Sequence, residues 1–379
     1  MNVNFPIYAL PPAADALRAQ VRQFIADEKA AGHWQRRGDF STAHDAGFSA
    51  RLGARGWIGM TWPKAYGGQD ASTLERLVVT EELIAANAPM AAHWIGDRQS
   101  GPLLLRFGSE EQRQTYLPKI ARGECFFAIG MSEPDSGSDL ASVRTRAVPV
   151  EGGWKVTGRK VWTTFAHVNH YAIVLVRTGD AGESRHEGLS QLIVDLHDPK
   201  VQINPIINMA GHREFNEVVF DDTFVPAENM VGEPGNGWQQ VTSELAYERS
   251  GPERYLTCIR LAEAIIDAAR QQPSPRIKAA IGRLAAKLIA LRTMSVSVAA
   301  SLQQGATPNL EASFIKDLGN SFEQQQIDIL RELVAEVAQP SAELYDALTE
   351  ATLYSPSWSL RGGTREILRG VVARGLGLR

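Results

Sequence analysis

The hydrophobic periodicity of this chain changes twice, and this change constrains the fold more than any single motif. Between about residues 12 and 121, apolar residues recur at helical spacing. Between about residues 124 and 232, short runs rich in β-branched residues alternate with Gly, Pro and Asp. Beyond Gly237 the helical period returns, as along residues 281–291. The pattern predicts an α+β chain that ends in a bundle of long helices.

Three domains follow from these changes in pattern. We expect an N-terminal α-helical domain over residues 1–122, a middle β domain over residues 123–234 and a C-terminal helical bundle over residues 235–379. A chain of 379 residues is long enough for two or three domains of about 150 residues each. In the middle domain, strands are expected at residues 171–177, 189–196, 201–207 and 215–224.

The composition narrows the classes of function. An apolar fraction of 44% and a charged fraction of 22% are typical of a soluble globular protein. The net charge of −4 gives no reason to expect a nucleic acid or an anionic membrane as partner. Cys125 and Cys258 cannot build a disulfide framework, which fits a reducing compartment. No uninterrupted apolar run approaches about 18 residues and no signal peptide is apparent, so we expect a cytoplasmic protein without a membrane-spanning helix.

Two segments of the middle domain carry chemical information. Residues 127–140 pass from an apolar run, typical of a buried strand, into a loop of Ser, Pro and Gly. Such a loop lets backbone amides approach a ligand closely. Residues 158–166 read Gly-Arg-Lys-Val-Trp-Thr-Thr-Phe-Ala. Taken alone, each segment also fits an ordinary turn or a core Trp beside strand threonines.

A third segment lies near the end of the chain, where residues 360–367 read Leu-Arg-Gly-Gly-Thr-Arg-Glu-Ile. Thr364 is predicted to cap the last helix, with Glu366 in its first turn, where a carboxylate suits the helix dipole. Two glycines before a helix allow a ligand to approach backbone N–H groups. The alternative is a capped helix after a flexible turn.

In their order and spacing, these segments resemble the acyl-CoA dehydrogenase family, and the resemblance covers nearly the whole chain. Shorter matching segments stand at residues 62–68, 101–118, 220–229 and 235–238. In that family FAD lies between the β domain and the C-terminal bundle, and the resemblance implies the same fold and cofactor here. Trp162 would cover one flavin face, and Thr164 would bind near flavin N5. The implied FAD-binding residues are Met131, Ser132, Gly137, Ser138, Trp162, Thr163, Thr164, Thr364 and Glu366.

The catalytic base departs from the commonest pattern of the family. Many members have their catalytic Glu where this chain has Gly362. A second branch, similar to the isovaleryl- and long-chain enzymes, places a Glu-Arg pair on the helix after the β domain, and Glu248-Arg249 matches it. Pro252 lacks an N–H and crowds the carbonyl of residue 248, which predicts a kink or an opened turn there. Glu248 is therefore predicted as the base, the alternative being a solvated or paired surface Glu.

The resemblance implies α,β-dehydrogenation of an acyl-CoA to the trans-2-enoyl-CoA, with electrons passed to an electron-transfer flavoprotein. Ser138, Arg249 and Gly363 are the implied substrate contacts, and a backbone N–H near Gly362 or Gly363 would bind the thioester carbonyl. One alternative is a flavin oxidase or monooxygenase on the same fold. Another is a partner subunit in a heteromeric acyl-CoA dehydrogenase. Acyl chain length, branching and the carrier do not follow from the sequence.

Two family segments through which a neighbouring subunit contacts FAD are missing. Arg-x-x-Phe-Gly is replaced by Arg-Gln-Gln-Pro-Ser-Pro-Arg at residues 270–276, so that Arg276 would have to supply the charge. Gln-x-x-Gly-Gly-x-Gly is also absent, since residues 336–360 contain no glycine. We expect a homo-oligomer, a dimer or a tetramer, or else a hetero-oligomer with a related subunit. The homo-oligomer is favoured because Glu248, Trp162 and Thr164 stand in one chain.

Other chemistries find less support. His167 and His170 form an H-x-x-H pattern without a nearby carboxylate or thiolate pattern, so we expect no metal site. There is no G-x-G-x-x-G opening a βαβ unit and no G-x-S-x-G nucleophile elbow.

Overall fold

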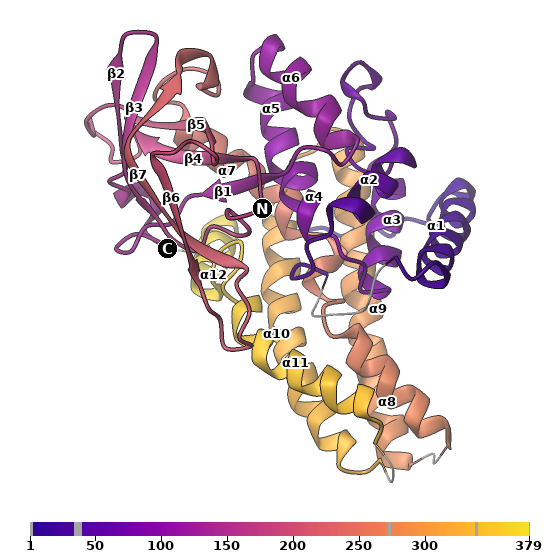
Figure 1. Cartoon of the computed structure of the whole chain (residues 1–379). Helices are drawn as coiled ribbons and strands as arrows, with labels where there is room; N and C mark the ends of the chain where they lie inside the picture. The colour runs from indigo at the N-terminus through magenta and orange to yellow at the C-terminus, as the bar shows by residue number, and fades with distance from the viewer. Residues whose placement is uncertain (1–2, 34–39, 272–273, 338–339, 379) are drawn as a thin grey trace. The chain divides into compact units, whose positions relative to one another are not determined.

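The computed structural model describes residues 3–33, 40–271, 274–337 and 340–378, without the side chains of residues 244–248 and 271. The predicted α+β class is confirmed, with helices, then strands, then long helices along the chain (Figure 1). Two compact units form. One combines Met1–Phe40, Ser72–Ala88 and Ala246–Arg379, and the other combines Ser41–Ala71 and Pro89–Leu245. The division into three domains stays a prediction.

The strands of the second unit form one sheet in the order β1-β4-β2-β3-β7-β6, with β5 paired to β4. β1 runs parallel to β4, and β3, β7 and β6 are joined in antiparallel pairs. The four strands expected from the sequence are confirmed as β4 to β7. The bounds are β1 (Phe127–Gly130), β2 (Arg146–Val150), β3 (Gly153–Lys160), β4 (Tyr171–Arg177), β5 (Leu189–Asp195), β6 (Val201–Ile206) and β7 (Phe215–Pro226).

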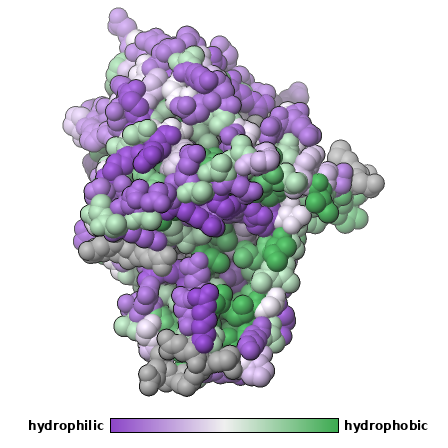
Figure 2. Space-filling view, turned by 90° about the vertical axis from the view of Figure 1, so that its right-hand side faces the viewer, coloured by the Kyte–Doolittle hydropathy of each residue, from purple (hydrophilic) through white to green (hydrophobic). Residues whose placement is uncertain are grey.

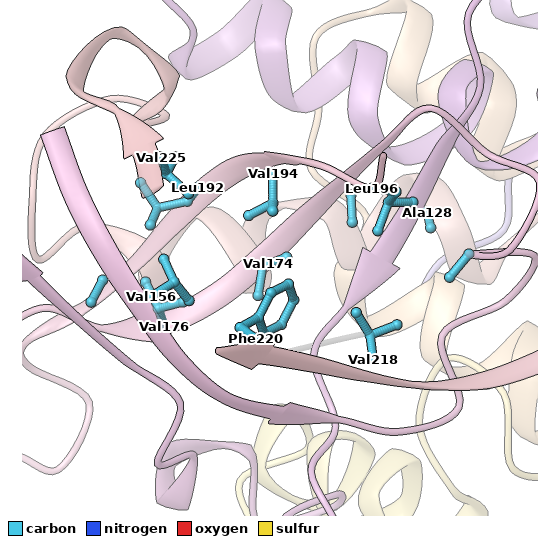
Figure 3. Packing of buried hydrophobic residues seen from close by; sticks show 13 residues of the cluster. Ala128, Val156, Val174, Val176, Leu192, Val194, Leu196, Val218, Phe220 and Val225 are labelled. Carbon is cyan, nitrogen blue, oxygen red and sulfur yellow. The ribbon is translucent and has the colours of Figure 1, made fainter. Parts of the chain in front are cut away.

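Aliphatic side chains of these strands form a continuous core. Figure 3 shows Phe220 of β7 beside Val174 of β4, within a cluster that also includes Val156 of β3 and Leu192 of β5. Burying each such side chain contributes about 1.5–3 kcal/mol. This core fixes the strand ends from which the loops after β1 and β3 leave the sheet.

Two helices of the second unit, α2 and α6, begin with side-chain caps. α6 begins with a capping box, in which Ser109 and Gln112 exchange side-chain to backbone hydrogen bonds of 3.2 and 3.1 Å. Gln112 Nε2 also donates to the carbonyl oxygens of Glu228 and Met230, which attaches α6 to the segment after β7. The bounds are α2 (Ala46–Ala54), α4 (Ala91–Ile95), α5 (Gly101–Phe107) and α6 (Glu110–Ala121), with a π-helical turn at Gly96–Ser100.

The first unit is a helical bundle in which α10 contacts α9, α11 and α12, as the orange and yellow helices of Figure 1 illustrate. α7 (Gly237–Arg249) ends three residues before Pro252, which opens a short 3₁₀ turn, so the helix ends rather than kinks. The bounds are α1 (Pro12–Ala30), α3 (Thr73–Ala85), α8 (Ile259–Gln271), α9 (Pro275–Gln303), α10 (Asn309–Val334), α11 (Ala342–Trp358) and α12 (Arg365–Gly375).

By length and composition alone, α9 could cross a membrane, and it is the one such helix in the described ranges. The core helix of a soluble bundle passes the same test, and α9 packs against α3 and α10 with Leu284 and Leu291 buried. The bundle thereby buries part of its apolar surface, while Ile289 remains exposed. Figure 2 shows hydrophobic residues also reaching the surface of the lower part of the molecule, where the C-terminal helices lie.

The packing of α10 against the turn after α7 depends on Gly319. A Cβ added at this position would lie 2.2 Å from the carbonyl oxygen of Arg254, so backbone would have to move. We expect Gly319→Ala to destabilise the protein by about 1–3 kcal/mol, a typical cost of overpacking. The matched control is Gly282→Ala on α9, where an added Cβ meets nothing within 4 Å. Thermal unfolding should show a lower Tm for the first variant and an unchanged or higher Tm for the control; equal Tm values would contradict the argument.

Candidate functional site

The structure brings the segments at residues 127–140 and 158–166 together. β1 ends at Gly130 and β3 ends at Lys160, and the chain continues from both into neighbouring loops. The Val161 N–H donates to the Ser132 carbonyl at 2.9 Å. Lys160 Nζ donates to the Met131 carbonyl at 3.0 Å and to Glu133 Oε1 at 2.8 Å. Two segments that are separate in sequence are therefore one structural unit.

Lys160 and Glu133 form a buried ion pair with further hydrogen bonds. The Lys160 side chain is fully buried, and the Glu133 carboxylate also accepts from the N–H groups of Arg144 and Thr145. Burial lowers the pKa of Lys160 to about 8, although Glu133 opposes this shift. Burial alone would raise the pKa of Glu133, but the Lys160 charge and the hydrogen bonds outweigh it and lower that pKa. The pair is charged at neutral pH and fixes both loops.

The loop after β3 holds its residues in an unusual conformation. Trp162 and Phe165 have φ values of 61° and 53°, in the left-handed region that non-glycine residues rarely adopt. Between them, Thr163 exchanges backbone hydrogen bonds with Asn216, whose side chain also donates to the Thr163 carbonyl at 2.9 Å. These bonds hold the strained turn in place. The Trp162 indole remains 59% exposed, with its edge toward Phe215.

The chemistry of this loop pair fits a flat heterocycle with a phosphate tail. Thr163 Oγ1 is buried and has no hydrogen-bond partner among the residues that the structure describes. A buried hydroxyl without a partner indicates a missing polar ligand. Trp162 offers an open aromatic face. Gly137 and Ser138 are exposed, and a Cβ at Gly137 would meet nothing within 4 Å. Met131, Ser132 and Thr164 are half-buried beside them.

The third segment lies in the first unit. Gly362 and Gly363 have φ values of 67° and 97°, so both use the freedom of glycine. Thr364 caps α12 as predicted, its side chain accepting from the Ile367 N–H. Hydrogen bonds to Glu366 from its own backbone N–H and from Thr364 lower the pKa of this exposed carboxyl. Arg361 Nη2 donates to the Glu253 carbonyl and to Thr257 Oγ1.

Two buried cations from other elements approach Gly363. Lys316 Nζ on α10 donates to the Gly363 carbonyl at 3.1 Å. The Arg249 guanidinium, at the end of α7, would lie 3.4 Å from a Cβ added at Gly363, and its Nη1 lies 3.4 Å from Ser313 Oγ on α10. Arg249 is thus placed beside the Gly362–Gly363 loop, and its contact with the substrate stays a prediction. The Glu248 side chain lies outside the described residues.

The two histidines of the H-x-x-H pattern have structural roles. His167 Nδ1 lies 3.0 Å from Asn216 Oδ1, and His170 Nδ1 accepts from the Phe126 N–H at 3.1 Å. Across the described ranges, no group of three or more His, Cys, Asp or Glu side chains is arranged to hold a metal ion.

Comparison with known proteins assigns the chain to a family. Three family models match the chain in order: the N-terminal domain of acyl-CoA dehydrogenase at residues 11–124, the middle domain at residues 128–223 and the C-terminal domain at residues 235–377. The chain belongs to the acyl-CoA dehydrogenase family. The acyl-CoA dehydrogenase IpdE1 of Mycobacterium tuberculosis is 32% identical to this chain, over 96% of this chain and 97% of the relative.

Solved structures agree with this assignment. A structure named Tcur3481-Tcur3483 steroid ACAD is 28% identical, with a TM-score of 0.87 over 100% of both chains. The ChsE4-ChsE5 complex from Mycobacterium tuberculosis is 27% identical, with a TM-score of 0.82 over 100% of both chains. This acyl-CoA dehydrogenase is an oxidoreductase of a flavoprotein family, and its cofactor is FAD.

Within this acyl-CoA dehydrogenase, the residues predicted for FAD fall into two groups. Met131, Ser132, Gly137, Ser138 and Trp162–Thr164 lie on the paired loops of the sheet, and Thr364 and Glu366 begin α12. Their individual contacts with FAD stay predictions. Sequence reasoning missed the residues behind them, above all Glu133, Lys160 and Lys316. The sequence signal that could have indicated them is a charged residue at or just after the end of a strand, as at Glu133 and Lys160, or among the buried positions of a helix, as at Lys316.

The Glu133–Lys160 pair generates a pH prediction. Because the folded-state pKa of Glu133 is lowered, its stabilising contribution is complete above the unfolded value of about 4.3 and is lost as the pH falls through the folded value. We expect Glu133→Gln to lower Tm at pH 7, since Lys160 loses its partner. The Tm difference from wild type should shrink below about pH 4.5. Thermal melts of both proteins between pH 7 and pH 3 measure this, and a constant difference would disprove it.

Proposed function

We propose that the chain catalyses FAD-dependent α,β-dehydrogenation of an acyl-CoA to its trans-2-enoyl-CoA, with Glu248 as the base and an electron-transfer flavoprotein as acceptor. The observation that carries this proposal is the cradle of paired loops after β1 and β3, with an exposed Trp162 and an unpartnered Thr163 hydroxyl. The Glu248-Arg249 pair at the end of α7 supports the choice of base, since Gly362 leaves the other family position without a carboxylate.

The reaction removes a proton from the α-carbon and a hydride from the β-carbon, so that a double bond forms between them. FAD, when bound, supplies the acceptor for the hydride. Glu248 would take the α-proton as its carboxylate. A backbone N–H of the Gly362–Gly363 loop would donate to the thioester carbonyl, where negative charge develops as the proton leaves. Arg249, buried beside that loop, would orient the thioester.

The substrate class we propose is a bulky, ring-containing acyl-CoA of steroid origin. Support comes from the name of a structural neighbour, steroid ACAD, at 28% identity over both complete chains. A panel of straight-chain, branched and steroid side-chain acyl-CoA substrates tests this under anaerobic conditions with an artificial electron acceptor. The highest kcat/KM on the steroid thioester supports the class, and a preference for straight chains rejects it.

A flavin oxidase on the same fold is the alternative enzyme. Oxygen consumption separates the two, because a dehydrogenase needs an added acceptor, whereas an oxidase turns over in air without one. Rapid turnover with oxygen as the sole acceptor would reject the electron-transfer flavoprotein as the acceptor.

The base assignment generates a direct prediction. Glu248→Gln should keep the fold and FAD but slow the bleaching of flavin absorbance by acyl-CoA by about 10²–10⁴-fold, the usual cost of a missing general base. Stopped-flow absorbance near the oxidised flavin bands measures the rate, and flavin-to-protein ratio and Tm serve as controls. An unchanged bleaching rate would reject Glu248.

We further propose that this chain assembles with a related but unlike chain. The two family segments that reach a neighbouring FAD are absent here, and two structural neighbours carry names of two components. Arg276, the candidate substitute, pairs with Glu332 of α10 and with Glu336, which follows the end of that helix. Residues 272–273 of the first missing segment lie outside the described residues. These observations favour the hetero-oligomer over the homo-oligomer that the sequence alone favours.

The assembly is tested by light scattering together with the flavin-to-protein ratio. We expect the chain expressed alone to be poor in FAD, and to gain FAD and activity when co-expressed with a related chain that carries both missing segments. A homogeneous homo-oligomer with one FAD per chain and full activity would refute the hetero-oligomer.

A further inference from the structure

Lys316 occupies an unusual place for a lysine. It lies in the middle of α10 and its side chain has no exposed surface. Burying an ammonium group is costly unless a partner compensates it. One of its hydrogen bonds is the 3.1 Å contact with the Gly363 carbonyl. A charged donor to a carbonyl is among the stronger hydrogen bonds of a protein.

The target of this hydrogen bond is intrinsically loose. Gly362 and Gly363 both have positive φ values, and two successive glycines lose more conformational entropy on ordering than other residues. Thr364 fixes the loop only on its α12 side. On the other side, Arg361 binds the Glu253 carbonyl and Thr257 Oγ1. Lys316 donates a hydrogen bond to the glycine pair itself, at the Gly363 carbonyl.

The same helix also supports the end of α7. Ser313 precedes Lys316 by three residues, which places both on one face of α10. Ser313 Oγ lies 3.4 Å from Arg249 Nη1, and Arg249 directly follows Glu248. One face of α10 therefore contacts both the Gly362–Gly363 loop and the residue next to the proposed base.

We propose that Lys316 is a positioning residue, which acts through the Gly363 carbonyl to hold the loop in the conformation that binds the thioester carbonyl. The inference rests on the proposed function, because it takes the loop N–H as the donor to the substrate. Lys316 touches neither substrate nor FAD in this account. The loop interaction strengthens as charge develops on the thioester oxygen, so its loss affects kcat more than KM.

The test compares Lys316→Met with Lys287→Met. Met fills a similar volume, and the loss of the hydrogen bond to the Gly363 carbonyl is offset in part because no ammonium group has to be desolvated. Lys287 is the matched control. It is an exposed lysine of α9, and its Nζ donates at 2.7 Å to Gln325 of α10, the helix that carries Lys316. For Lys316→Met we expect Tm and FAD content near wild type and faster hydrogen–deuterium exchange in residues 361–364. We expect kcat to fall about 10–100-fold with KM within about threefold, since small misplacements of a binding group cost that much. Lys287→Met should change none of these.

The proposal would be overturned if hydrogen–deuterium exchange in residues 361–364, or kcat, were the same in Lys316→Met as in the Lys287→Met control. Where Lys316→Met does not yield folded protein, Lys316→Arg decides, because the larger guanidinium keeps the charge but displaces the loop. A wild-type kcat in Lys316→Arg would also overturn it. If the wild-type protein oxidises no acyl-CoA, the proposed function fails, and the exchange comparison still reports whether Lys316 anchors the loop.

Discussion

The ion pair between Lys160 and Glu133 is the interaction on which the paired loops after β1 and β3 depend. A buried ion pair contributes little net stability, because desolvation offsets the attraction, but losing one partner is costly. The hydrogen bonds of the pair are completed by the Met131 carbonyl and by the N–H groups of Arg144 and Thr145. The ends of β1 and β3 also meet at this pair. The pair thereby specifies the geometry of two loops more than the stability of the sheet.

α10 has the corresponding role in the helical unit. Gly319 lets the backbone of Arg254 approach closely, and Asp317 accepts hydrogen bonds from Arg365 and Arg369 of α12. Lys316 directly precedes Asp317 in the helix, and its Nζ donates a hydrogen bond to the Gly363 carbonyl of the glycine loop. A single helix therefore fixes the turn after α7, the glycine loop and the start of α12.

The sequence was sufficient where the determining interactions are local. β4 to β7 could be predicted because β-branched runs between turn residues have few other structures available, and the Thr364 cap needs only its own helix. The long-range contacts that hold the loops could not be predicted, because Lys160 and Glu133 are 27 residues apart in sequence and Lys316 and Gly363 are 47 apart. Positive φ values at Trp162 and Phe165 were also hidden, since no glycine stands there. The resemblance of the segments indicated where the candidate site lies, and the structure adds the long-range contacts that hold its loops.

The strained turn at Trp162 has a kinetic consequence. Because the protein's own hydrogen bonds from Asn216 and the buried pair hold the turn, the conformational entropy of this loop is lost during folding. On the prediction that FAD binds at the Trp162 indole, cofactor uptake would need no prior rearrangement there, and association would take place in one step on an ordered surface. The cost appears earlier, as a slower or less stable fold around residues 158–166. Such a protein exchanges folding stability for readiness to bind.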